Sequence, residues 1–183
     1  ARCRICILQS TRLVEIGNLT RRRIKMNTKV HELINQQINK EFYSAYLYLD
    51  FSNYFEDAGL DGFANWYKIQ AQEERDHAML FYQYLQNQNQ KVTLEAIDKP
   101  DKAFSCHMDV LKAGLEHEKY VTSLIHNIYA EAYEAKDFRT MQFLDWFVKE
   151  QGEEETNAND MTSKMELFGS DLKSLYMPHQ EIA

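Results

Sequence analysis

The sequence has few of the residues that interrupt helices or cross-link small domains. Its 183 residues include six glycines, two prolines and three cysteines. So little glycine and proline argues against a turn-rich β architecture, and an odd, sparse set of cysteines does not describe a disulfide framework. The pair Cys3 and Cys6 would need a second pair of ligands to form a zinc site. We therefore expect an all-α chain in a reducing compartment, the cytoplasm.

Long apolar runs and positive net charge are also missing. No stretch approaches the roughly 18 apolar residues that a membrane-spanning helix requires, so no membrane partner is expected. The formal net charge is -7, whereas nucleic-acid binding requires a basic surface. We expect no nucleic-acid partner, and we predict that the protein binds cations.

The basic residues gather at the N-terminus. Residues 1–25 hold seven of them against one acid, so the remainder has 14 basic and 27 acidic residues and a charge of -13. Three interpretations of residues 1–25 stay open: a transit peptide, a phosphate-binding arm, or sequence upstream of a start at Met26, which is favoured. We predict a basic extension, disordered or outside the mature domain, and one domain at 26–183.

From Lys29 onward, apolar residues recur at alternating steps of three and four, which predicts helices that each bury one face. The predicted buried positions of the first two helices are Val30, Ile34, Gln37, Glu41, Ala45, Tyr48, Ser52 and Phe55, then Phe63, Tyr67, Gln70, Glu74, His77, Phe81 and Tyr84. Those of the next two are Leu111, Leu115, Glu118, Thr122, Ile125, Tyr129 and Ala132, then Leu144, Phe147, Gln151, Glu154, Ala158, Met161, Met165 and Phe168.

The connections predict how these helices are arranged. Gly59 ends the first helix and Asp61 caps the second, while residues 134–137 form a second short turn. Residues 87–104 read as a long connection, and a short fifth helix is expected from Ser170 to about Tyr176. Two short turns and one long crossover between the second and third helices predict a four-helix bundle.

Each predicted buried face carries one acid near the middle of its helix: Glu41, Glu74, Glu118 and Glu154. Four unpaired carboxylates in an apolar core would cost several kcal/mol apiece, and no lysine or arginine falls on these faces. A single such glutamate is more often simply hydrogen-bonded. Because all four faces are interrupted at a compatible level, we expect the acids to meet around bound cations.

His77 lies three residues after Glu74, on the same helix face. Oxygen donors with one imidazole suit iron or manganese, so a dinuclear site is predicted. Tyr48 is either a hydrogen-bond or electron donor to this site or a core aromatic, and both interpretations stay open. The remaining histidines fall off the buried faces and are expected at the surface: His31, His107, His117, His126 and His179. Glu73 and Glu150 flank the faces, which allows a third cation position.

Three stretches of the sequence resemble the ligand segments of the bacterial non-haem ferritins in order and spacing. They are Asn39-Lys-Glu-Phe-Tyr-Ser-Ala-Tyr-Leu-Tyr48, Ala71-Gln-Glu-Glu-Arg-Asp-His77 and Trp146-Phe-Val-Lys-Glu-Gln-Gly-Glu-Glu-Glu155. The resemblance covers Met26 to about Tyr176. Bacterioferritins instead have a second Glu-x-x-His motif, where this chain has Gln151-x-x-Glu154, and a methionine in place of Arg75, so no haem is expected.

The resemblance implies a ferritin-like bundle that stores iron and has ferroxidase activity. Glu41, Glu74 and His77 would hold one iron of a di-iron centre, and Glu74, Glu118 and Glu154 the other, with Gln151 nearby and Tyr48 beside the centre. Glu73, Glu150, Glu153 and Glu154 match a third iron site. The family also implies a homo-oligomeric shell of 24 subunits. A redox-inactive metal buffer and a peroxide-scavenging enzyme remain the alternatives.

Overall fold

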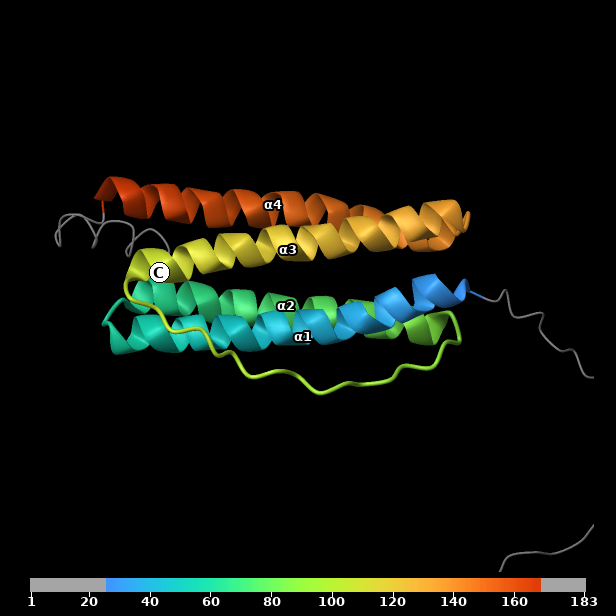
Figure 1. Ribbon diagram of the computed structural model, residues 1–183, viewed down its shortest axis with the longest axis horizontal. Helices are drawn as coiled ribbons and strands as arrows, with labels where there is room; N and C mark the ends of the chain where they lie inside the picture. Colours follow the sequence, from blue (N-terminus) through green and yellow to red (C-terminus); the bar gives the residue numbers. More distant parts are fainter. Residues whose placement is uncertain (1–25, 169–183) are drawn as a thin grey trace, which may run out of the picture.

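The computed structural model describes residues 26–168, which form four helices and no strand: α1 (Thr28–Asp57), α2 (Asp61–Asn87), α3 (His107–Glu134) and α4 (Phe138–Phe168). Helices α1 and α2 form one antiparallel pair, and α3 and α4 form a second (Figure 1). The predicted all-α bundle is confirmed. The expectations for residues 1–25 and for a fifth helix from Ser170 lie outside the described residues. None of the four helices is both long and apolar enough to cross a membrane.

The helix ends follow from local chemistry. The side chain of Asn27 caps α1 by accepting hydrogen bonds from the backbone nitrogens of Lys29 at 2.8 Å and Val30 at 3.3 Å. Gly59 has a φ of 70° just after α1, a left-handed conformation that glycine adopts without strain. The prediction that Asp61 caps α2 was wrong, because the cap is Leu60 and makes no side-chain bond. Asp61 instead supplies negative charge in the first turn of α2.

Residues 88–106 connect α2 to α3 without a helix or strand and run back along the bundle (Figure 1). Three polar side chains of α1, four residues apart and therefore on one face, fasten this segment. His31 Nε2 lies 2.9 Å from the Lys91 carbonyl oxygen, and Asn39 Nδ2 donates to the Ala96 carbonyl at 2.9 Å. Asn35 both donates to and accepts from the backbone of Thr93, at 2.9 and 2.8 Å. All these bonds are made to backbone atoms of the segment, so they do not depend on the side chains of the segment itself.

Replacing Asn35 with alanine should release the connection without unfolding the bundle. The variant loses two hydrogen bonds, each contributing about 1 kcal/mol, so cleavage within residues 88–106 during limited proteolysis should become several-fold faster. Gln36→Ala removes the exposed neighbouring amide and serves as the control. Equal cleavage rates in Asn35→Ala and Gln36→Ala would show that the hydrogen bonds of Asn35 do not hold the segment to α1.

The apolar core is divided into two clusters along the bundle axis. Each cluster consists of the buried apolar residues within four ranges of the chain, one for each helix. The ranges of the first cluster are Leu47–Phe55, Phe63–Ala71, Val110–Ala113 and Met161–Met165. Those of the second are Met26–Ile38, Phe81–Leu85, Val121–Ala132 and Leu144–Phe147. On every helix the predicted acid falls between the two clusters. The fold therefore places four acids in one polar layer between two apolar halves.

The predicted buried faces were too narrow in places. Ala45, Leu115, Thr122 and Tyr129 are only half-buried, while core positions are taken by residues outside those faces, Ile38, Ser44, Leu47, Phe51, Val121 and Ile128 among them. The helices also contact helices outside their own pair, α1 against α3 and α2 against α4 through the rings of Phe81 and Phe147, so their apolar faces are wider than a single seam.

Candidate metal centre

The four mid-helix glutamates and His77 come together in the polar layer, one acid from each helix. Glu41 and Glu74 are each 1% exposed, Glu118 is 2% exposed, Glu154 is 5% exposed and His77 is 6% exposed. Among the described residues, no lysine or arginine is buried. The acids therefore lack the cationic side chains that normally compensate buried carboxylates.

Glu41, Glu74 and His77 form the tightest part of the cluster. They offer one ligand atom each, and these atoms lie within 4.8 Å of one another. His77 Nδ1 is 3.6 Å from Glu74 Oε2. Glu41 Oε2 and Glu74 Oε2 are buried without a hydrogen-bond partner. Because orphaned buried oxygens are rare in proteins, these two atoms fit a bound cation, and the oxygen and imidazole donors suit iron or manganese.

Glu118 and Glu154 complete the cluster from α3 and α4. The Tyr48 hydroxyl on α1 donates to Glu118 Oε1, and Gln70 Nε2 on α2 donates to Glu154 Oε2 at 2.8 Å. Both hydrogen bonds cross from the α1–α2 pair to the α3–α4 pair. They hold the two halves of the bundle together at the level of the acids.

The buried acids resist ionisation. Burial raises the pKa of Glu41 and of Glu74 well above the usual value, and the charges of Glu74 and Glu118, respectively, raise them further. Burial also raises the pKa of Glu118, against hydrogen bonds from Tyr48 and Gln151 that lower it. Burial, followed by the charges of Glu118 and Glu73, raises the pKa of Glu154 to about 7. A multivalent cation would reverse this balance by stabilising the ionised carboxylates.

The flanking residues predicted for the site differ in how deeply they are buried. Gln151 is 3% exposed and directs its amide nitrogen toward Glu118 Oε2 at 3.2 Å. Glu73 is exposed and Glu150 is half-buried. Partial desolvation is the main cause that raises the pKa of Glu73, and the Glu150 charge adds a smaller increase. Glu153 is exposed and pairs with Lys149 at 3.0 Å. Thus Gln151 joins the buried layer, whereas Glu73, Glu150 and Glu153 lie at its rim.

His117 does not match the surface position expected for it. Its Nε2 lies 2.7 Å from the Ser44 hydroxyl, and its ring contacts that of Tyr48 edge-on at 5.8 Å. Burial, with smaller effects of Lys102 and Lys40, lowers its pKa to about 4.

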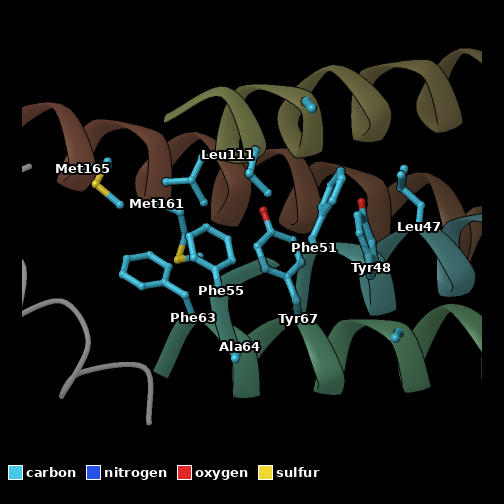
Figure 2. Packing of buried hydrophobic residues seen from close by; sticks show 13 residues of the cluster. Leu47, Tyr48, Phe51, Phe55, Phe63, Ala64, Tyr67, Leu111, Met161 and Met165 are labelled. Atoms are coloured by element: carbon cyan, nitrogen blue, oxygen red, sulfur yellow. The ribbon is translucent and has the colours of Figure 1, made fainter. Parts of the chain in front are cut away.

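Tyr48 is 2% exposed, and the centre of its ring lies 5.6 Å from that of Tyr67. The hydroxyl groups of both tyrosines point from α1 and α2 toward the opposite helix pair (Figure 2). Tyr48 is therefore both a core aromatic and a hydrogen-bond donor to the site.

Two residues were predicted to be buried but not to act in the site. Gln37 Nε2 donates to Glu41 Oε1 at 2.9 Å, and Gln70 donates to Glu154. The sequence did contain a signal for this role, because one glutamine lies four residues before Glu41 and another lies four residues before Glu74, on the same predicted buried faces. An amide on a buried face is as unusual as an acid there.

A four-helix bundle with four buried glutamates and a histidine around one centre defines a class of carboxylate-rich metal-binding proteins. Within this class the chain belongs to the ferritin family, whose ferritin-like domain model matches residues 31–168. A bacterial non-heme ferritin of Staphylococcus haemolyticus is 34% identical over 83% of this chain and 92% of its own length. One from Campylobacter jejuni is 35% identical over 86% and 94%. A solved open pore ferritin from the archaeon Archaeoglobus fulgidus superposes with a TM-score of 0.84 at 39% identity, covering 86% of this chain and 96% of its own.

Proposed function

We propose that this chain stores iron, oxidising ferrous iron with dioxygen at a di-iron centre and depositing a ferric oxyhydroxide mineral inside an oligomeric shell. The observation that carries the proposal is the buried cluster of four glutamates and His77 without a buried lysine or arginine among the described residues, in which Glu41 Oε2 and Glu74 Oε2 lack partners. Family membership supports iron as the metal.

The roles follow from position. Glu41, Glu74 and His77 hold one ferrous ion, while Glu74, Glu118 and Glu154 hold the other, so that Glu74 bridges the two. Two ferrous ions each give up one electron, and the pair of electrons reduces one dioxygen to hydrogen peroxide, which takes up two protons. Water then hydrolyses the two ferric ions to oxyhydroxide, with a net release of protons. Carboxylates stabilise the higher charge of ferric iron and exchange readily enough to release it. Tyr48 holds Glu118 in place through its hydroxyl.

The rim carboxylates extend the proposal from oxidation to storage. Glu73, Glu150 and Glu153 carry negative charge beside Glu154, which suits a third iron position on the way from the oxidation centre to the mineral. The Archaeoglobus fulgidus relative is described as an open pore ferritin, which supports a hollow assembly for this chain as well. We infer a homo-oligomeric shell of 24 subunits for this chain, with residues 26–183 as its domain and residues 1–25 outside it. The cytoplasm stays the predicted location, and haem is not expected.

The test is an anaerobic ferrous titration followed by a pulse of air, with oxygen uptake, ferric absorbance and protein-bound iron after gel filtration all measured. The proposal predicts oxidation faster than in buffer and ferric iron that elutes with the protein. Binding without accelerated oxidation would favour the metal buffer. Faster turnover with hydrogen peroxide, without retained ferric iron, would favour the peroxide-scavenging enzyme.

A further inference from the structure

Three glutamines are buried against the acids, and each donates a hydrogen bond to a different carboxylate. Gln37 on α1 donates to Glu41 at 2.9 Å, Gln70 on α2 donates to Glu154 at 2.8 Å, and Gln151 on α4 donates to Glu118 at 3.2 Å. The three side chains are 1%, 5% and 3% exposed, in that order. Among the described residues, no glutamine amide donates to Glu74.

The pairing is not what helix spacing alone would produce. Gln37 and Gln70 each stand four residues before a site glutamate on their own helix. Gln37 bonds to that glutamate, but Gln70 passes over Glu74 and crosses the bundle to Glu154. The acid that is left without an amide, Glu74, is the one whose position between both halves of the cluster suits a bridge.

Each amide also determines how its carboxylate faces the centre. Gln37 occupies Glu41 Oε1, which leaves Oε2 buried without a partner. Gln151 is oriented in turn by Thr122, whose hydroxyl lies 3.4 Å from its Nε2 and donates to Glu155 at 2.6 Å. An amide fixed in this way presents N–H rather than oxygen to Glu118. It acts as a donor to a ligand, not as a ligand.

Stability alone does not explain these residues. A buried amide gives at best a small net gain over an apolar side chain of the same shape, and its hydrogen bond to an acid is useful mainly when that acid is ionised. A methionine at each position would fill the same space without needing a partner.

We propose that Gln37 and Gln70, together with Gln151, are positioning residues that make Glu41, Glu154 and Glu118 terminal ligands of the metal pair and leave Glu74 as the only carboxylate free to bridge. The inference rests on the proposed function, because it assigns roles within the same site. Neither Gln37 nor Gln70 touches the metal ions in this arrangement.

The test uses zinc, which occupies the site without redox chemistry, on the full-length assembled protein. Zinc binding to wild type, Gln37→Met and Gln70→Met is measured by calorimetry, with Gln36→Met, an exposed glutamine of α1, as the matched control. Loss of a residue that orients a metal ligand typically lowers affinity by about 10- to 100-fold, and this loss is expected for both buried positions. Gln36→Met should bind as wild type does.

Infrared difference spectra separate positioning from a general structural effect. In wild type, zinc should produce the wide splitting between antisymmetric and symmetric carboxylate stretches that marks monodentate ligands. In both buried variants part of this signal should move to the smaller splitting of bridging or chelating carboxylates, because the freed carboxylate is no longer held as a monodentate terminal ligand. If either methionine variant fails to assemble, the corresponding leucine variant replaces it.

Wild-type affinity and wild-type spectra in both buried variants, with zinc binding lost in Glu74→Ala, would overturn the inference and leave the proposed site intact. Wild-type zinc binding in Glu74→Ala would overturn the site itself, and the inference with it.

Discussion

In the air-pulse assay, Glu74→Ala is expected to oxidise ferrous iron no faster than buffer does. Glu74 lies between the Glu41–His77 side and the Glu118–Glu154 side of the cluster, so its loss removes a ligand from both metal positions at once. Since even the loss of a residue that only orients a ligand costs a metal site about 10- to 100-fold, the initial rate should fall by about 100-fold or more.

The control for this variant is Asp76→Ala, two residues further along α2. Asp76 is exposed and pairs with Arg75 at the surface, so its removal changes the charge of the helix without touching the cluster. Asp76→Ala should keep the wild-type rate and iron retention. If Glu74→Ala oxidises iron as fast as Asp76→Ala does, the centre lies elsewhere.

The metal-free protein should lose stability as the pH rises toward neutrality. The pKa of Glu154 is raised from 4.5 to about 7, so this group stabilises the fold fully below pH 4.5 and loses that contribution as the pH rises through 7. Each pKa unit corresponds to about 1.4 kcal/mol, which makes the loss about 3 kcal/mol for this group by pH 8. The raised pKa values of Glu41, Glu74 and Glu118 act in the same direction.

Denaturation midpoints measured with a chelator between pH 5 and pH 8 test this expectation. Glu154→Gln keeps the shape of the side chain and an acceptor for Gln70 but cannot ionise, so its midpoint should vary less with pH and exceed that of wild type at pH 8. Zinc should restore wild type at pH 8 and do less for the variant. A wild-type profile that is flat or rises from pH 5 to pH 8 would show that other groups already compensate the buried carboxylates in the metal-free protein.

The positions of the acids could be predicted because they depend on helix periodicity alone. Glu41, Glu74, Glu118 and Glu154 each fall on an apolar face at mid-helix, and a bundle with short turns brings those levels together. Their hydrogen-bond partners could not be predicted in the same way. The choice of Gln70 between Glu74 on its own helix and Glu154 across the bundle depends on the distance between helices, which no single helix encodes.

His117 shows a second limit of helix-face reasoning. It precedes Glu118 and falls off the predicted buried face of α3, which predicted a surface position. In the bundle α1 covers this face as well, and Ser44, Tyr43 and Tyr48 surround the imidazole. Burial by a neighbouring helix is a property of the packing, and the pattern along α3 does not contain it.

The most direct test of the central claim is a crystal structure of the protein soaked anaerobically with ferrous iron, with anomalous scattering measured at the iron edge. The account predicts two strong peaks in the polar layer, one among Glu41, Glu74 and His77 and the other among Glu74, Glu118 and Glu154. Iron bound only at surface carboxylates, with no peak between the two apolar clusters, would contradict it.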